Sequence, residues 1–380
     1  MDFTFTREQQ MLGDTVQRFV NQEYAFAPTR ERILRSPEGW SREVWAKLAE
    51  LGVLALQVPE EFGGLGAASV ETLLAMNAFG RGLLLEPYLS SAILGTCLVR
   101  DLGSPDQRGA LLPALAAGER IVVPAHGEHV ARHDLSVVET RAVRSGDGWL
   151  LDGAKAVVAD AGAADLLVVS ARTSGGPADE QGISLFLVER GAAGVTLAPF
   201  PLLDRRRAAD VTLRQVRLPA GALLGPEGGA FPALTAAWDV GIAALCAEAV
   251  GALQAILQAT IDYTKQRKQF GVPIAKFQAL QHRMADMLIH VEQARSMSYL
   301  AAIRCTEPGR AARERAVSAA KVTVGQACRR VGQEAVQLHG GMGVTDELNV
   351  GHWFQRLASI EISLGDTEHH LERFVGTEET

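Results

Sequence analysis

The sequence predicts an α+β fold in which helices occupy both ends of the chain and strands occupy the middle. Three observations support this fold class. Apolar residues recur at helical spacing up to about residue 117, alternate with polar residues over about 121–225, and return to helical spacing from Phe231 onward. We therefore expect three domains, at 1–120, 121–225 and 226–380. The 380 residues suffice for this division, because a single core rarely grows beyond roughly 250 to 300 residues.

The first predicted domain begins with an amphipathic helix. In FTREQQMLGDTVQRFV, apolar residues recur every three or four positions, and Thr6 followed by Gln9 has the pattern of a helix N-cap pair. Further along, VPEEFGGLG at 58–66 combines proline and glycine in a way that is typical of a turn between helices. We expect residues 1–120 to form an α-helical domain with this turn between its helices.

The middle domain carries the signals of short strands. Several runs are rich in leucine and valine or alternate apolar and polar residues, with Gly and Asp between them. Many short strands separated by turns are typical of a small barrel or sandwich. The runs are WLLDGAKAVVADAGAADLLVVSART, ISLFLVERG, GVTLAPF and DVTLRQVRL.

The third domain is predicted to be a helical bundle. One apolar stripe at helical spacing passes through a first long helix, and a second long helix runs near Val317 to Leu338. Gly340 and Gly341 then form a natural helix stop. The stripe consists of Phe277, Leu280, Met284, Met287 and Val291.

Composition and charge argue against several classes of function. A net charge of −7 argues against nucleic acid as a partner, because phosphate binding usually needs a basic face. The start, MDFTFTREQQ, lacks the pattern of a signal peptide, and no apolar run reaches the roughly 20 residues that span a bilayer. Four widely spaced cysteines without a CxxC pair predict reduced thiols in a cytoplasmic protein. The polar cluster from His126 to Asp134 contains Gly127, which spoils a helical ligand face, so we expect no metal site.

Two runs in the third domain indicate a cofactor site. They are RKQFGVPIAKFQALQHRMADM at 267–287 and QLHGGMGVTDE at 337–347. Together with VPEEFGGLG and LDGAK at 151–155, they resemble the acyl-CoA dehydrogenase family over nearly the whole chain. The resemblance implies an N-terminal α-helical lobe, a middle β-barrel and a C-terminal four-helix bundle. It also implies FAD, oxidation of an acyl-CoA thioester to 2-enoyl-CoA, a homodimer or homotetramer, and electron-transfer flavoprotein as the electron acceptor.

The residue types in these runs suit a dinucleotide with a pyrophosphate. An arginine supplies a planar, permanent charge, an amide and an aromatic plane stand beside it, and glycines let backbone N–H groups approach an anion closely. The alternative is a solvated helix end followed by an ordinary turn. The joint occurrence of both runs favours FAD, bound across to the neighbouring subunit. By the resemblance, the residues that hold it are Arg267, Gln269, Phe270, Gln337, Gly340 and Gly341.

The middle domain departs from the family pattern. Many members carry Thr-Glu-Pro-Gly near its start and Trp-Ile-Thr after the Gly-x-Lys run, and both pieces flank the flavin ring. Here Glu128 is the counterpart of the first glutamate, and His129 replaces the proline. The tryptophan and the threonine of the second piece are replaced by Val157 and Ala159. The resemblance therefore assigns Glu128 to the cofactor site, with weaker flavin contacts around it.

The usual catalytic base is missing. The reaction takes a proton from Cα as a hydride leaves Cβ, and a carboxylate serves as base when burial raises its pKa. Most members place a Glu in an Ile-Tyr-Glu-Gly-Thr segment, which aligns with ISLGD, so Leu364 stands where the Glu is expected. Other members carry the base ten residues before a glycine that is Gly251 here, and that position is Gly241.

Three interpretations follow. Either Asp366 or Glu248 acts as a displaced base, the chain is the base-less member of a heterotetramer, or the fold hosts another flavin oxidation, of nitroalkanes or amines. The alternative role for Asp366 is an N-cap for a helix from Thr367, and that for Glu248 is a helix-surface or subunit-contact carboxylate. The LDGAKAVVA and HHLERF stretches look most like the small subunit of a bacterial pimeloyl-CoA dehydrogenase.

Overall fold

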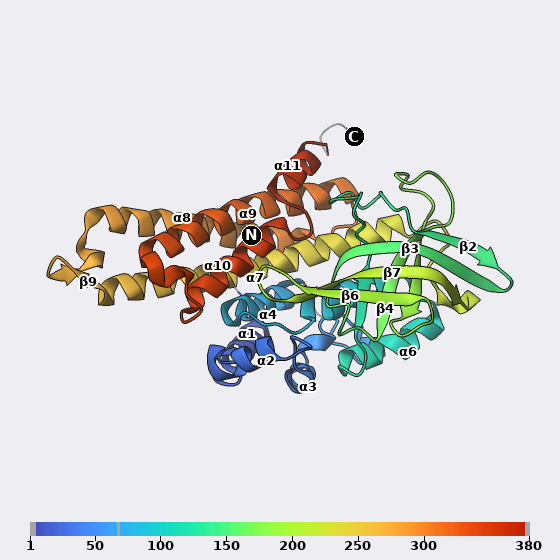
Figure 1. Ribbon diagram of the computed structural model, residues 1–380, viewed down its shortest axis with the longest axis horizontal. Coiled ribbons are helices and arrows are strands. Elements are labelled where there is room, and N and C mark those ends of the chain that lie inside the picture. The colour runs from blue at the N-terminus through green and yellow to red at the C-terminus, as the bar shows by residue number, and fades with distance from the viewer. Residues whose placement is uncertain (1–4, 67–68, 377–380) are drawn as a thin grey trace. The chain divides into compact units, whose positions relative to one another are not determined.

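The computed structural model describes residues 5–66 and 69–376 of the protein. The chain forms two compact units, each with its own core (Figure 1). The helical unit comprises Met1–Arg32, Ser69–Leu84 and Ile242–Thr380, and the sheet unit comprises Ile33–Ala68 and Leu85–Gly241. Each unit is therefore assembled from segments that lie far apart in the sequence.

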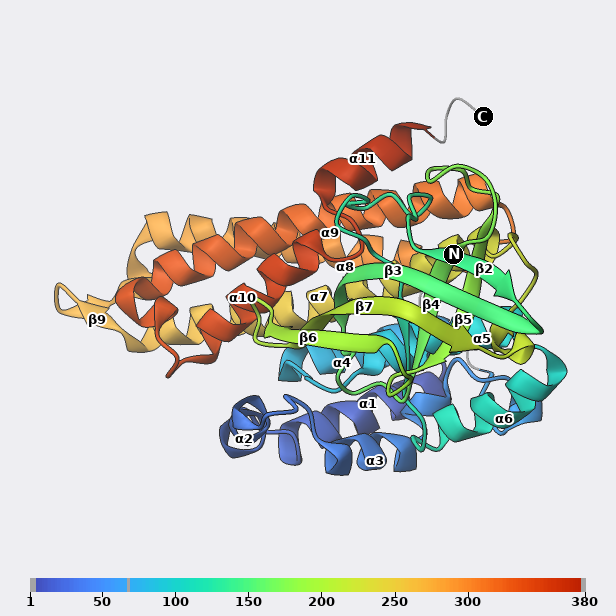
Figure 2. The same cartoon turned by 45° about the vertical axis from the view of Figure 1, so that its right-hand side comes forward.

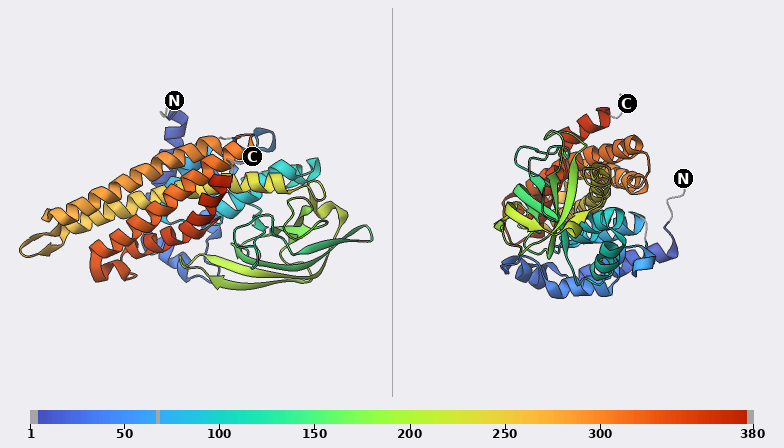
Figure 3. Two further views of the ribbon diagram at one scale, coloured as in Figure 1. Left: turned by 90° about the horizontal axis from the view of Figure 1, so that it is seen from above. Right: turned by 90° about the vertical axis from the view of Figure 1, so that its right-hand side faces the viewer.

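Long helices make up the helical unit. In the left view of Figure 3, α8 and α9 run side by side in orange. The two ends of α9 are set by glycine, since Gly309 precedes it and Gly340 ends it with φ +62°. The predicted helix stop is therefore confirmed. The helices are α1 (Arg7–Gln22), α4 (Ser69–Gly82), α7 (Phe231–Gln266, from Ile242 onward in this unit), α8 (Gln278–Arg304), α9 (Arg310–His339), α10 (Asn349–Ile362) and α11 (Thr367–Gly376).

Local sequence signals place several of these helices. At the start of α1, Thr6 Oγ1 accepts from the Gln9 N–H while the Gln9 side chain accepts from the Thr6 N–H, so the predicted capping pair is confirmed. The predicted stripe on α8 is buried only at Met287 and Val291, whereas Phe277 is 38% exposed. The first turns of α8 thus keep an apolar surface open to solvent in the single chain.

Glycines let α4 and α7 approach at backbone distance. A Cβ on Gly80 would lie 1.9 Å from the Glu248 carbonyl oxygen, and a Cβ on Gly251 would lie 1.9 Å from the Asn77 carbonyl oxygen. No side chain fits at either place. The α7 helix is long and apolar enough to cross a membrane, but 89% of its most apolar window is buried, as in the core helix of a folded domain.

The sheet unit centres on one eight-stranded sheet in the order β6-β7-β3-β2-β4-β5-β8, with β1 pairing to β4 in parallel (Figure 2). Every residue of β4 is buried. The short helical segment η4 (Tyr88–Gly95) packs on β1 so closely that a Cβ on Gly95 would meet the Val122 carbonyl oxygen at 2.0 Å. The strands are β1 (Val122–Ala125), β2 (Arg141–Ser145), β3 (Gly148–Ala159), β4 (Leu166–Arg172), β5 (Ile183–Glu189), β6 (Val195–Pro201), β7 (Arg207–Leu218) and β8 (Leu223–Leu224).

Shorter elements complete the two units. In the helical unit, β9 and β10 form an antiparallel hairpin between α7 and α8, and η7 follows α9. The α2 helix crosses from one unit to the other. These elements are η1 (Phe26–Arg30), α2 (Glu31–Arg35), α3 (Arg42–Glu50), η2 (Val53–Ala55), η3 (Glu60–Phe62), α5 (Thr96–Leu102), α6 (Pro105–Ala116), η5 (Ala220–Ala222), β9 (Lys268–Gln269), β10 (Val272–Pro273), η6 (Ile274–Lys276) and η7 (Gly340–Val344).

Candidate active site

The segment 361–366, called the 361–366 turn below, joins the end of α10 to the start of α11 and has an unusual backbone. Leu364 has φ +55° and Gly365 has φ +106°, so two consecutive residues lie at positive φ. A leucine pays a steric cost of about 1 to 2 kcal/mol in the left-handed helical region, where glycine is at ease. A Cβ on Gly365 would also lie 2.6 Å from His370 Nε2. The surrounding residues must therefore hold this turn in place.

Lys321 on α9 is one of the groups that hold it. Its Nζ donates to the Glu361 carbonyl at 2.9 Å and to the Gly365 carbonyl at 2.6 Å. The side chain is fully buried, and burial lowers its pKa. Burial also raises the pKa values of the nearby thiols of Cys246 and Cys328, so these remain neutral.

His370 on α11 holds the middle of the same turn. Its Nε2 lies 3.0 Å from the Leu364 carbonyl oxygen, and its Nδ1 lies 3.2 Å from Ser318 Oγ. A carbonyl can only accept, so the Nε2 carries the proton and Nδ1 accepts from the serine hydroxyl. Burial, and then the charge of Lys321, lower the pKa of His370 to about 2, so the ring stays neutral.

Asp366 lies at the end of this turn and is half-buried. Its Oδ1 accepts a hydrogen bond of 2.8 Å from the His369 N–H, which is the geometry of an N-cap on α11. The capping role considered from the sequence is therefore present. Nearby, Glu361 Oε1 accepts from Arg329 at 2.8 Å and from the Thr367 hydroxyl at 3.0 Å.

Glu248 on α7 occupies a different environment from the one expected. It is 1% exposed, and its two oxygens accept from Nε and Nη2 of Arg356 on α10, each at 2.7 Å. The expectation of a helix-surface or subunit-contact carboxylate is wrong. It failed because the partner arginine is more than 100 residues away in the sequence.

The two predicted cofactor runs meet at one end of the helical unit. Tyr263 near the end of α7 stacks on His339 at the end of α9, with ring centroids 4.3 Å apart, and its hydroxyl donates to the His339 carbonyl at 3.2 Å. Arg267 follows one turn after Tyr263, and Gly340 follows His339 directly. The structure thus brings together runs that are separated by about 70 residues.

Every predicted cofactor residue in these runs is exposed. Phe270, at the tip of the β9–β10 hairpin, is 89% exposed, and a Cβ on Gly340 or Gly341 would meet nothing within 4 Å. Exposed donors beside open backbone suit a large anionic ligand such as FAD. The residues are Arg267, Gln269, Phe270, Gln337, Gly340 and Gly341.

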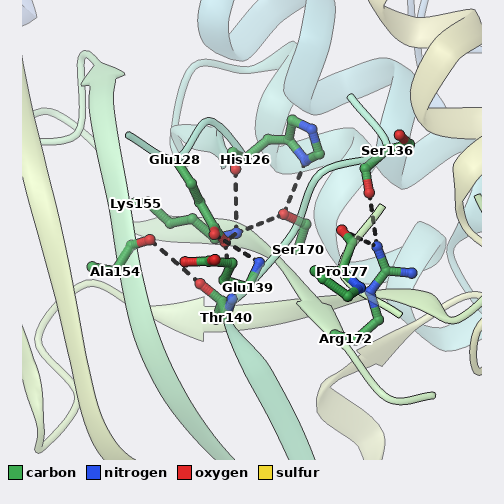
Figure 4. A network of polar contacts seen from close by, with 10 residues as sticks. All are labelled: His126, Glu128, Ser136, Glu139, Thr140, Ala154, Lys155, Ser170, Arg172 and Pro177. Carbon is green, nitrogen blue, oxygen red and sulfur yellow. Dashed lines mark hydrogen bonds and ion pairs between the residues drawn. The ribbon is translucent and has the colours of Figure 1, made fainter. Parts of the chain in front are cut away.

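Glu128 in the sheet unit is engaged within the protein (Figure 4). Its Oε1 accepts from Lys155 Nζ at 2.6 Å, and its two oxygens also accept the N–H groups of Thr140 at 3.1 Å and Glu139 at 2.7 Å. Burial works to raise the pKa of Glu128, but Lys155 and these hydrogen bonds outweigh it and the pKa is lowered. Burial lowers the pKa of Lys155 to about 8 despite Glu128. The carboxylate therefore fixes the chain around it.

The segment after Lys155 corresponds to the Trp-Ile-Thr piece that flanks the flavin ring in many members of the family. Val157 has φ +51° and is 53% exposed, and its N–H donates to Asp210 Oδ1 at 2.9 Å. Val158, by contrast, is buried. A small apolar side chain thus stands exposed where the family pattern has a tryptophan. Within residues 5–66 and 69–376, no group of three or more His, Cys, Asp or Glu side chains forms a metal site.

Comparison with known proteins agrees with this arrangement. Models of the acyl-CoA dehydrogenase N-terminal, middle and C-terminal domains match residues 6–119, 125–214 and 231–375. A probable acyl-CoA dehydrogenase of Bacillus subtilis (strain 168) is 31% identical over 99% of this chain and 98% of its own length. The chain belongs to the acyl-CoA dehydrogenase family.

Solved structures of the family share the same fold. Butyryl-CoA dehydrogenase of Megasphaera elsdenii superposes with a TM-score of 0.90, covering 100% of both chains at 26% identity. A chain of the ChsE4–ChsE5 complex from Mycobacterium tuberculosis gives 0.89 at 27% identity, covering 100% of this chain and 99% of that one. The predicted fold class is confirmed. As an acyl-CoA dehydrogenase, the chain is a flavin-dependent oxidoreductase acting on the CH–CH group of acyl-CoA.

The sequence did not identify two residues that hold the candidate site of this acyl-CoA dehydrogenase. Lys321 and His370, which hold the 361–366 turn, were not singled out as site residues. One signal for Lys321 was available, because SAAKVTVG places a lysine inside an otherwise apolar helical run. No comparable signal indicates the partner of His370, because that partner is a backbone carbonyl.

Proposed function

We propose that this acyl-CoA dehydrogenase oxidises an acyl-CoA at Cα–Cβ, with Asp366 as the base and the Leu364 N–H as a donor to the thioester carbonyl. The observation that supports this is the 361–366 turn, in which Leu364, at the position of the expected glutamate, has a left-handed backbone. FAD, when bound, accepts the hydride from Cβ. A hydrogen bond to the thioester carbonyl makes the Cα proton more acidic, since negative charge develops on that oxygen.

Among the carboxylates considered, Asp366 is the best placed. Glu248 is buried in a bidentate pair with Arg356, and a base held in that way must break the pair to take a proton. Asp366 belongs to the turn itself and is half-buried. Its Oδ1 bond to the His369 N–H fixes the carboxylate relative to Leu364, two residues away.

The test separates the base from the helix cap. Asparagine caps a helix about as well as aspartate, but it cannot take a proton. We expect Asp366→Asn to slow flavin bleaching by an acyl-CoA at least about 100-fold in anaerobic mixing, with an unchanged melting temperature. Asp366→Ala should slow bleaching and also lower the melting temperature, because alanine neither takes a proton nor caps the helix. Glu368→Gln is the control and should change neither quantity. Bleaching by Asp366→Asn at the wild-type rate would exclude Asp366 as the base.

We further propose that the FAD site lies at the exposed end of the helical unit and is completed by a second copy. The exposure of Phe270 and the open backbone at Gly341 support this. Glu128 would contribute indirectly, by holding its segment with Lys155. Arg267→Met should lower FAD retention roughly tenfold relative to Lys268→Met. Full flavin retention by the Arg267 variant on gel filtration would contradict this site.

A second candidate function is a base-less subunit that needs a related chain. Leu364 at the position of the usual carboxylate favours it, and so does likeness to the ChsE4–ChsE5 complex. The small subunit of a pimeloyl-CoA dehydrogenase pair is the form this would take. Bleaching only after addition of a homologue that carries the glutamate would establish this function. Bleaching by nitroalkanes or amines, and not by thioesters, would instead indicate a different flavin oxidation.

Three finer properties follow from the family and remain part of the proposal. We infer a cytoplasmic homodimer or homotetramer, with a heterotetramer as the alternative, and electron-transfer flavoprotein as the acceptor. The open apolar face at the start of α8, around Phe277, supports assembly with another subunit. Sedimentation of the purified chain with and without FAD distinguishes a dimer from a tetramer.

A further inference from the structure

We propose that Lys321 and His370 are positioning residues for the dehydrogenation, because they set the direction of the Leu364 N–H; this rests on the donor role proposed above. Neither side chain is proposed to touch the substrate. Each acts through a backbone carbonyl of the 361–366 turn.

Lys321 fixes the two ends of the turn from one atom. Its Nζ reaches the carbonyls of Glu361 and Gly365, which are four residues apart, at 2.9 and 2.6 Å. The end of α10 and the start of α11 are thereby tied to the same point on α9. Because Lys321 is fully buried, water cannot readily replace these bonds.

His370 fixes the middle of the turn. Its bond to the Leu364 carbonyl orients the peptide that follows Leu364, and the Ser318 hydroxyl holds the ring from the opposite nitrogen. A leucine at φ +55° would relax to negative φ if this restraint were lost, because the left-handed form is the less stable one. Such a rotation about φ would turn the Leu364 N–H relative to the rest of the turn.

The Leu364 N–H is a donor that this arrangement leaves available. No described residue accepts a hydrogen bond from it, whereas the carbonyls of Glu361, Leu364 and Gly365 each accept one. Three held carbonyls around this N–H make it a rigid donor, as expected of a site that binds a ligand oxygen.

Two unreactive ligands test the proposal in the holoenzyme. One is an alkyl-CoA thioether, which lacks the carbonyl. The other is a ketone analogue of the same chain length that retains the carbonyl but has oxygen in place of Cβ, so that no hydride can leave. We expect the wild type to bind the ketone more tightly. His370→Leu and Lys321→Met should reduce this preference about tenfold and leave the thioether Kd unchanged. His370→Gln, whose amide can still donate to the carbonyl, should retain most of the preference.

A matched control separates positioning from general damage. His352 is also buried in the helical unit, but it contacts Arg30 and the Asp346 carbonyl instead of the turn. His352→Leu should lower the melting temperature without changing the ligand preference. If Lys321→Met does not fold, the comparison of His370→Leu with His370→Gln decides the question.

The outcomes distinguish this proposal from the one on which it rests. A wild-type preference for the ketone that His370→Leu leaves intact overturns the positioning role alone. A wild type without any preference removes the donor role of Leu364 as well. Equal losses for both ligands would show that the two residues support the fold and not the direction of the N–H.

Discussion

Gly365 shows how much of the turn is determined by a single residue. Its φ of +106° is a region that side chains rarely adopt, and a Cβ there would lie 2.6 Å from both His369 Cδ2 and His370 Nε2. Leu364, at the position where a glutamate is expected, lies directly before this glycine and itself has φ +55°.

We predict that Gly365→Ala lowers the free energy of unfolding by about 2 kcal/mol or more, since it combines backbone strain with a collision against His370. Gly309→Ala is the control, because a Cβ at Gly309 would meet nothing within 4 Å. Urea unfolding measures both. A change below about 0.5 kcal/mol in the Gly365 variant would mean that the turn relaxes freely, and the restraint by His370 would then be weak.

Residue roles were predictable from the sequence where they depend on near neighbours. The Thr6–Gln9 cap spans three residues, and the possible cap at Asp366 is equally local; both appear as hydrogen bonds. Lys321 and Glu248 were not predictable in the same way. Their partners lie 40 to 108 residues away, and burial alone decides whether a charge needs such a partner.

At the scale of elements, the Glu248–Arg356 pair joins α7 to α10. Both side chains are nearly fully buried, and the guanidinium meets the carboxylate through two parallel bonds of 2.7 Å. Removing one partner leaves an uncompensated buried charge, whereas removing both does not.

A double-mutant cycle tests this link. Glu248→Leu should cost about 3 to 5 kcal/mol of unfolding free energy, and so should Arg356→Met. The double variant should cost clearly less than the sum of the two. If the loss of unfolding free energy in the double variant equals the sum of the two single losses, Glu248 and Arg356 do not stabilise each other. Flavin bleaching by the double variant, which has no carboxylate at residue 248, would also exclude Glu248 as the base.

Element types followed from periodicity better than element packing did. The long helices lie where apolar residues have helical spacing, and most strands lie where apolar and polar residues alternate. The β9–β10 hairpin was not predicted as strands, because each strand has only two residues and carries no pattern. Only Met287 and Val291 of the predicted α8 stripe are buried, because periodicity indicates an apolar face and not what covers it.

At the scale of the whole molecule, the sequence could not show which segments share a core. Trp353 Nε1 on α10 donates to the Arg81 carbonyl on α4 at 3.1 Å, across 272 residues. The helical unit combines both ends of the chain, whereas the three domains expected at 1–120, 121–225 and 226–380 are consecutive; their boundaries stay a prediction. Such pairing depends on complementary surfaces, as at Gly80 and Gly251, and a single sequence does not reveal them.

Each unit contains a buried neutral histidine, and together they predict how stability depends on pH. In the sheet unit, burial and then Lys155 lower the pKa of His126 to about 3, with Glu128 opposing. In the helical unit, burial and the positive charge of Lys321 lower that of His370 to about 2, and His369 and Arg373 act in the same direction. Both folded values lie below the unfolded value of 6.5. The unfolded chain therefore binds more protons as pH falls, and stability declines below about pH 6.5.

Each of these two histidines should contribute about 1.4 kcal/mol of unfolding free energy per pH unit once the pH is well below 6.5, so the two together give roughly 2.8 kcal/mol per unit. Urea unfolding at pH 7.5, 5.5 and 4.8 measures this slope before most carboxylates titrate. His370→Gln should reduce the slope by about 1.4 kcal/mol per pH unit, because glutamine does not titrate. An unchanged slope in His370→Gln would show that this ring is already protonated in the folded protein, and a protonated ring could not accept the Ser318 hydroxyl proton at Nδ1.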